Sequence, residues 1–420
     1  MSQLTQSTPE TLGRKSIGSL LLQYSVPAVI ASVATSLYNI IDSIFIGRGV
    51  GAMAIAGLAI TFPLMNLVMA FCMFIAVGGA AVSSIFLGQQ NRDRATDVLN
   101  NVLVLCLIHS VVFGGLAFVF LDDILIFFGA TDSTIPFARE FMQVILLGSP
   151  ISYVFIGLNN IMRATGYPRK AMISALLSVV ANIIIAPILI FKLDWGIRGA
   201  AFSTICGQTV ALIWVLIHFS SSKSFVHFDF RMSWLKWTIV RRIYAIGMSP
   251  FLMNVCACVV VIFINHALLD CAGSDGDLAV GAFGILNRTT MFFVMIVFGV
   301  TQGMQPILGY NYGAGNIVRV KRTLRIGIWI GVAITSVGWA LTELIPSTIS
   351  SLFTVDPTLI AIASRGFRIY FIFYPLVGAQ IIIQNFFQAV GHPIYSIILS
   401  LTRQLLLLCL LYTSDAADEL

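Results

Sequence analysis

Long uninterrupted apolar runs constrain this chain more than any other feature. Eleven are long enough to cross a bilayer, which takes roughly 20 residues per helix, and they lie near residues 20–46, 54–86, 95–120, 135–162, 170–192, 197–219, 243–269, 278–309, 323–345, 360–388 and 394–411. The strands of a membrane barrel would alternate apolar and polar side chains instead. Only 10% of the 420 residues are charged, against about 25% in soluble domains. The sequence therefore predicts an all-α membrane protein.

The basic residues predict the orientation of these spans. If the N-terminus is cytoplasmic, sixteen Lys and Arg fall in cytoplasmic segments, whereas three (Arg48, Lys192 and Arg198) fall in external loops. Cytoplasmic loops of membrane proteins carry the excess of Lys and Arg. We therefore expect residues 1–19 to form a cytoplasmic N-terminal segment. The net charge of +6 then describes topology, and no nucleic acid partner is expected.

The second half of the chain repeats the first at a spacing of 225 residues. The matched pairs are Ala54 and Ala279, Gly88 and Gly313, Asn91 and Asn316, Pro150 and Pro375, Asn160 and Asn385, Ala164 and Ala389, Gly166 and Gly391, and Pro168 and Pro393. In the first span the spacing is 223, between Pro27 and Pro250. Six spans per repeat is an even number, so both halves have the same orientation. Parallel repeats of this kind are a recurrent transporter architecture, with the substrate path between them.

The repeat defines the expected domains. Residues 20–219 would form an N-terminal lobe of six transmembrane helices, 220–242 a basic cytoplasmic linker, and 243–411 a C-terminal lobe with five helices. A counterpart of the span 197–219 would fall beyond residue 420, and the polar tail 412–420 does not continue the pattern. We expect that the twelfth helix is missing from this chain and that the tail is not native; a genuine eleven-span protein is the alternative.

One carboxylate, Asp42, falls well inside an apolar run. A charge at bilayer depth costs roughly 2.5–3.5 kcal/mol on insertion scales, so such a residue is a functional candidate by default. Tyr38 and Asn39 precede it by four and three residues, which places all three on one helical face. The alternatives are that Asp42 reaches the external interface, and that Tyr38 and Asn39 form interhelical hydrogen bonds.

Three short stretches carry a family resemblance. They are Asp42-Ser-Ile-Phe-Ile-Gly47 at the end of the first span, Arg163-Ala-Thr-Gly166 after the fourth, and Gln388-Ala-Val-Gly391 after the tenth. Together with the repeat, they make residues 15 to 411 resemble the multidrug and toxic compound extrusion (MATE) transporters, in particular the bacterial efflux branch. The resemblance implies two six-helix lobes around a central cavity, and export of cationic or amphipathic compounds in exchange for H⁺ or Na⁺.

The resemblance also implies a cation-coupling site in the N-terminal lobe. Asp42 matches the first-span Asp of the family, Asn182 its fifth-span Asn, and Thr204 its sixth-span Thr. Four residues after Asn182, where the family has a second Asp, this chain has Ala186. Hard cations need several oxygen ligands, so we expect H⁺ as the coupling ion, with Na⁺ as the alternative. Cys258 stands roughly where some members carry a seventh-span Glu, so the C-terminal lobe is not expected to bind the ion.

The expected mechanism is a protonation switch. Burial disfavours the charged form of a carboxyl, so Asp42 can be protonated near neutral pH, and protonation would loosen its bonds to Tyr38, Asn39 or Asn182. Pro27 lacks an N–H and is expected to kink the first helix. A proton favours the neutral state of Asp42 and a drug cation favours the charged state, so the two would compete for the protein. This coupling between their binding free energies would produce antiport.

Other functions are less well supported by the residues. A lipid-linked oligosaccharide flippase would need several basic residues in its cavity; Arg288 and Arg403 lie in or near spans, but structural pairing or lipid contact is favoured for both. A membrane-embedded enzyme would need clustered acids, bases or metal ligands, and His109, His218 and His266 are not clustered, so no metal site, cofactor or catalytic residue is expected. An inactive truncated fragment is a further alternative.

The expected protein is a monomer in a bacterial plasma (inner) membrane, in contact with lipids and small-molecule substrates.

Overall fold

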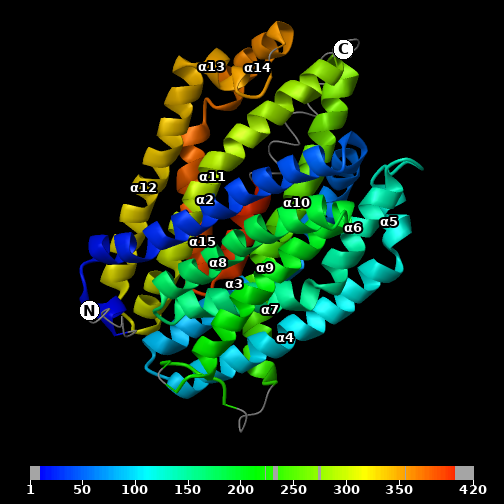
Figure 1. Ribbon diagram of the computed structural model, residues 1–420. Coiled ribbons are helices and arrows are strands. Elements are labelled where there is room, and N and C mark those ends of the chain that lie inside the picture. Colours follow the sequence, from blue (N-terminus) through cyan, green and yellow to red (C-terminus); the bar gives the residue numbers. More distant parts are fainter. Residues whose placement is uncertain (1–9, 223, 230–234, 273–275, 355, 403–420) are drawn as a thin grey trace.

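The computed structural model describes residues 10–222, 224–229, 235–272, 276–354 and 356–402, and these form a bundle of helices (Figure 1). The side chains of Asn39, Ala52, Cys258 and residues 261–280 are not described. The first half contains α1 (Thr11–Arg14), α2 (Ile17–Gly49), α3 (Ala52–Gly88), α4 (Arg92–Val119), α5 (Leu121–Phe127), α6 (Ile135–Leu147), α7 (Ser149–Ala164), α8 (Pro168–Pro187), the π-helical turn η1 (Ile188–Lys192) and α9 (Gly196–Ser220). The second half contains α10 (Trp237–Ala272), α11 (Gly276–Gly313), α12 (Ile317–Leu344), α13 (Pro346–Ser351), α14 (Pro357–Tyr370), α15 (Tyr374–Ala389) and a helix over Pro393–Thr402.

These helices confirm the predicted all-α membrane fold. Seven described helices are long and apolar enough to cross a membrane, and two bent helix pairs raise this number to nine. All of the first ten predicted spans fall on described helices or helix pairs. The eleventh begins in the Pro393–Thr402 helix, and the rest of it lies outside the described residues, as does the tail 412–420.

The helix boundaries confirm the internal repeat. Helices α4 and α12 begin and end at positions 225 residues apart, and so do α7 and α15. Both α4 and α12 start with the same cap: the side-chain oxygen of Asn91 accepts from the backbone N–H of Arg94 at 3.0 Å, and that of Asn316 from Arg319 at 3.3 Å. An Asn at this position satisfies one of the N–H groups that a helix start leaves free. Each repeat thus folds by the same local rules.

Two predicted spans are bent rather than continuous. Helices α6 and α7 meet at Gly148 with a bend of 54°, and α14 and α15 meet with a bend of 57°. Pro150 and Pro375 lie in the first turn of α7 and α15. A proline cannot donate to the preceding turn and its ring clashes with the carbonyl four residues earlier, so it ends one helix and begins the next.

The two repeats meet along a seam, formed by the contacts of α2 and α3 with α10 and α11. Figure 1 shows α2 running beside α11 between the group of α12 to α14 and the group of α4 to α6. A Cβ atom at Gly247 of α10 would lie 1.7 Å from the carbonyl oxygen of Phe74, and one at Gly303 of α11 would lie 2.5 Å from the backbone of Ser25. Small residues of this kind allow helix backbones in membranes to approach closely. The seam is therefore packed backbone against backbone.

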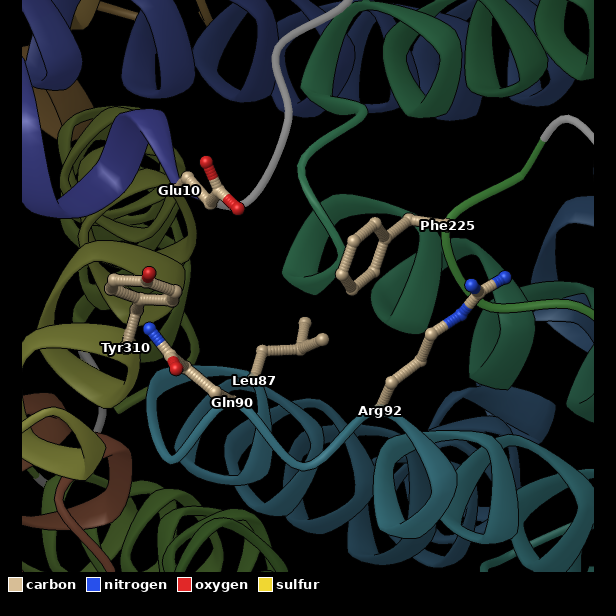
Figure 2. A pocket seen from close by; sticks show the side chains of 6 residues that line it. All are labelled: Glu10, Leu87, Gln90, Arg92, Phe225 and Tyr310. Atoms are coloured by element: carbon tan, nitrogen blue, oxygen red, sulfur yellow. The ribbon is translucent and has the colours of Figure 1, made fainter.

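Two further close seam contacts, of Gly88 with Tyr310 and of Gly313 with Ile85, lie at one end of the bundle, which we call the basic end. It carries α1, the α3–α4 turn, residues 224–229 and the α11–α12 turn. There α1 bridges to the second repeat, because Arg319 donates to the carbonyls of Leu12 at 3.0 Å and Lys15 at 2.6 Å. A cavity of about 220 Å³ lies at this end (Figure 2), lined by Glu10, Leu87, Gln90, Arg92, Phe225 and Tyr310.

The segment between α9 and α10 is tied to α4 by a polar network. Lys236 donates through Nζ to Asp97 Oδ2 at 2.6 Å, and its backbone N–H donates to Asn101 at 2.9 Å. The Asp97 side chain is 4% exposed and that of Lys236 is 36% exposed. The start of α10 is therefore fixed against the first repeat by a largely buried ion pair.

We expect Lys236→Met to destabilise the protein by roughly 2 kcal/mol, because it leaves the buried carboxylate of Asp97 without its cation. Asp97→Asn should have a smaller effect, since the partly exposed Lys236 can turn to water. Thermal unfolding in detergent measures both. Arg139→Met, which breaks the exposed pair of Arg139 with Asp122, is the control and should change stability by less than about 0.5 kcal/mol. If Lys236→Met and Arg139→Met lowered stability equally, this would contradict the conclusion that the ion pair of Lys236 with Asp97 fixes the start of α10.

Candidate functional site

Asp42 lies on α2, seven residues before the helix ends at Gly49. It is 8% exposed, and its Oδ1 atom is buried without a hydrogen-bond partner among the described residues. A carboxylate that reached out to the membrane interface would be exposed to water, so the burial argues against that alternative. A buried carboxylate oxygen without a donor is unfavourable when charged. The Oδ1 atom of Asp42 is thus a buried acceptor that no described donor satisfies in this conformation.

One helical turn before Asp42, Tyr38 connects α2 to α9. Its hydroxyl lies 2.8 Å from Oγ1 of Thr204. Asn182 of α8 donates to the same Thr204 oxygen at 3.3 Å and to Oγ of Ser203 at 3.1 Å. Asn182 is 3% exposed and Ser203 is fully buried. Three of the residues predicted for cation coupling, Tyr38, Asn182 and Thr204, therefore share one hydrogen-bonded cluster.

Close packing of α8 against α9 positions this cluster. A Cβ atom on Gly207 of α9 would lie 2.5 Å from the carbonyl oxygen of Ser178 and 3.3 Å from Cβ of Asn182. Only a glycine lets the two helices approach so closely, which brings the Asn182 amide within reach of the α9 hydroxyls. Ala186, one turn after Asn182, is fully buried. The position at which the family pattern has a second acid is thus filled by a methyl group.

Ser203 was not predicted. It precedes Thr204 directly, but the family pattern that pointed to Thr204 includes no residue at position 203. Neighbouring residues on a helix point in directions about 100° apart, so a role for Thr204 did not imply one for Ser203. The structure shows that Asn182 lies between the two hydroxyls and donates to both. Both hydroxyls also donate back to the carbonyl of Ala200, Ser203 at 2.7 Å and Thr204 at 3.2 Å.

The other predicted residues are more scattered. Pro27 is buried within α2, which continues as one helix through it. Arg288 is exposed on α11, outside the cluster. The side chains of Asn39 and Cys258, and all of Arg403, lie outside the described residues. None of the predicted coupling residues lines the cavity at the basic end.

The cluster offers hydroxyls and an amide, and the carboxylate of Asp42 lies one helical turn away from Tyr38 on α2. Within the described part of the chain, no group of three or more His, Cys, Asp or Glu side chains is close enough to hold a metal ion. His109 contacts the hydroxyl of Tyr244 at 2.8 Å, and His218 contacts Lys170 and Ser224, each at 3.2 Å. These histidines have hydrogen-bond partners rather than acidic neighbours. The Asp42 region can therefore take up a proton or exchange hydrogen bonds.

Two helical repeats that meet at a seam, with a buried carboxylate in one of them, are typical of membrane transporters. The MatE family model matches residues 27–188 and 245–413, one copy on each repeat. The chain belongs to this family of transporters.

Individual relatives agree with this. The multidrug export protein MepA of Staphylococcus haemolyticus is 26% identical over 401 residues, which cover 96% of this chain and 88% of that protein. MepA of Staphylococcus aureus is 24% identical over 396 residues, covering 94% and 87%. Among solved structures, an outward-facing multidrug resistance MATE family transporter has a TM-score of 0.88 at 23% identity, covering 96% of this chain and 89% of that one. A MOP superfamily transporter from Pyrococcus furiosus has a TM-score of 0.86 at 23% identity, with the same coverage. These structures show the fold.

Proposed function

We propose that this protein exports cationic or amphipathic drugs and toxic compounds by antiport with H⁺, and that protonation of Asp42 is the coupling step. The observation that carries the proposal is the buried carboxylate of Asp42, whose Oδ1 has no described partner one turn from a cluster that joins α2 to α8 and α9. The names of the MepA relatives, which are multidrug export proteins, support the substrate class.

The proposed arrangement has two lobes, residues 20–219 and 243–411, joined by the linker 220–242 in a bacterial plasma membrane. The N-terminus and the basic end would face the cytoplasm, as the distribution of Lys and Arg favours. The close glycine contacts near the basic end would then make this the state closed toward the cytoplasm. Substrate would leave and protons would enter on the opposite side.

The hydrogen bonds of Tyr38 suggest how protonation of Asp42 could change the packing of α2. In this conformation Tyr38 bonds to Thr204 and leaves Oδ1 of Asp42 unsatisfied. A charged Asp42 would compete for nearby donors, because hydrogen bonds to a carboxylate are roughly twice as strong as neutral ones. Loss of the proton would therefore draw donors toward Asp42, and α2 would repack against α8 and α9. A bound drug cation would favour the charged state, so that drug and proton displace each other.

The ligands around Asp42 support H⁺ over Na⁺. A hard cation prefers several oxygen ligands, most of them charged or carbonyl. Ala186 removes the second carboxylate, and the hydroxyl oxygens of Ser203 and Thr204 already accept hydrogen bonds from Asn182. A single protonatable group needs no further ligands.

Dye efflux from proteoliposomes under separate H⁺ and Na⁺ gradients tests the proposal. An H⁺ gradient should drive export of a cationic dye, and a Na⁺ gradient of equal size without a pH difference should not. Export driven by Na⁺ alone would reject the coupling ion. Failure of both gradients with every cationic dye would reject drug antiport and favour the flippase alternative.

Thr204→Val should lower H⁺-driven dye efflux about tenfold, because it removes the oxygen that contacts both Tyr38 and Asn182 while keeping the shape of the side chain. Thr209→Val is a matched control on the same helix. The Thr209 hydroxyl donates only to the carbonyl of Ile205 at 2.7 Å, so this variant should stay within about twofold of wild type. Initial efflux rates per reconstituted protein provide the comparison. Equal efflux rates for Thr204→Val and Thr209→Val would show that the hydrogen-bonded cluster takes no part in the mechanism.

A further inference from the structure

Arg163 is a buried positive charge for which the coupling site gives no role. It lies in the last turn of α7 and is 8% exposed. It forms no ion pair with a carboxylate among the described residues. An arginine side chain keeps its charge in proteins, and burying a cation without a counter-charge is strongly unfavourable. Stability alone therefore does not explain a buried charge at this position.

The bonds of Arg163 are to two neutral amides. Nη2 donates to Oδ1 of Asn159 at 3.2 Å. Nη1 contacts Oε1 of Gln302, which lies on α11 in the other repeat. Asn159 is itself fixed, because its Nδ2 donates to the carbonyl of Ala171 at 2.9 Å and to Oγ of Ser174 at 2.5 Å. The guanidinium is therefore held firmly by the first repeat and directed across the seam.

The internal repeat provides a comparison within the same chain. The residues 225 positions after Asn159 and Arg163 are Gln384 and Gln388. Gln388 is 3% exposed and donates to the hydroxyls of Ser249 and Ser396, each at 3.2 Å. A neutral amide therefore satisfies the same place in the fold. The charge on Arg163 is not needed to build the helix pair.

Alternation between two states would change what Arg163 faces. When two lobes move as rigid bodies, the seam between them is closed at one end in one state and open at that end in the other. Residues that lie in the closed seam in the first state therefore line the opening in the second. Gln302 would leave with α11, whereas Asn159 would stay with α7. The guanidinium would then face the opening with free donors, and guanidinium is well suited to bind a carboxylate through two parallel hydrogen bonds.

We propose that Arg163 is a specificity-determining residue that binds an anionic group of the substrate in the state open at the basic end, so that the protein exports zwitterionic amphiphiles that carry a carboxylate beside their cation. This inference rests on the proposed export function and names a substrate class within it. The structural basis is a fixed, uncompensated guanidinium at the seam whose cross-seam partner is a neutral amide.

The test compares rhodamine B, a zwitterion with a free carboxylate, with its ethyl ester, a cation of nearly the same shape. Both are measured as efflux from proteoliposomes that contain wild type, Arg163→Gln, Arg163→Lys or Arg288→Gln. Arg288→Gln is the control, because it removes one exposed charge from α11 away from the cluster. The quantity of interest is the ratio of the two efflux rates, since a change in how readily the lobes open affects both dyes equally.

Arg163→Gln should lower the ratio of rhodamine B to ester efflux about tenfold or more, as expected for a lost charge-assisted contact. Arg163→Lys should lower it less, because the charge remains but the paired donors are lost. Arg288→Gln should leave it unchanged. An unchanged ratio in both Arg163 variants, or a wild type that exports the ester and not rhodamine B, would overturn the inference. A wild type that exports other cationic dyes but neither of these two would also overturn the inference, whereas a wild type that exports no cationic dye would overturn the export function itself.

Discussion

Asp42→Asn is expected to reduce H⁺-driven drug efflux about 100-fold, to the level of vesicles without protein. Asparagine has nearly the same shape as a protonated aspartate but cannot release a proton. A ligand shifts the equilibrium between two states of a protein only if it binds them with different affinity. Because the variant has no carboxyl at position 42 to bind the proton, the H⁺ gradient would no longer shift its conformational equilibrium. Drug binding should survive, though weaker, because the variant cannot offer a negative charge to the drug cation.

A second acidic residue, Asp123, provides the control for the loss of one carboxylate. Asp123 lies on α5 and is exposed, so Asp123→Asn removes the same charge outside the bundle and should retain wild-type efflux. Efflux rates of wild type should change with pH, and those of the Asp42 variant should be flat. Coupled efflux that persists in Asp42→Asn would show that another group carries the proton.

Gly247→Ala is expected to have the second largest effect, through packing rather than chemistry. The added Cβ would lie 1.7 Å from the carbonyl oxygen of Phe74 and 2.6 Å from its carbon, so α3 and α10 must separate. Overpacking of this kind costs about 1–3 kcal/mol, and the strain falls on the state in which the seam is closed. We expect lower thermal stability and roughly tenfold slower transport.

Gly284→Ala is the matched control for the seam. Gly284 lies on α11, and a Cβ added there meets no atom within 4 Å. Because alanine is the better helix former by about 1 kcal/mol, this variant should be as stable as wild type or slightly more stable. Thermal unfolding in detergent and efflux rates from the same preparations give the comparison. A Gly247 variant that matches the Gly284 variant in both would mean that the seam is not closely packed.

The sequence predicted the repeat well because local rules act identically in both halves. Asn91 and Asn316 each cap a helix, and Gly166 and Gly391 each adopt a left-handed backbone, with φ of 103° and 80°. Such features depend only on neighbouring residues, so a conserved spacing in the sequence becomes a conserved boundary in the fold. The cluster of Tyr38, Asn182 and Thr204 followed from the family pattern and not from local rules.

Contacts between distant helices could not be predicted in this way. The bends at Gly148 and before Tyr374 required knowing that Pro150 and Pro375 begin new helices rather than kink a continuous one. The contact of Arg163 with Gln302 joins residues 139 positions apart, and its geometry depends on how the two repeats close. The bridge from Arg319 to Leu12 joins residues more than 300 positions apart. No periodicity in either segment indicates such a partner.

The most direct test of the central claim measures protons moved by a drug gradient. Proteoliposomes with a trapped pH indicator would be loaded with a cationic drug and diluted without a pH or Na⁺ gradient. Because coupling is reciprocal, drug leaving the vesicles should drive protons in and acidify the lumen with wild type, whereas Asp42→Asn should give no acidification. Drug efflux by wild type without any proton movement, or equal acidification by the variant, would contradict proton antiport through Asp42.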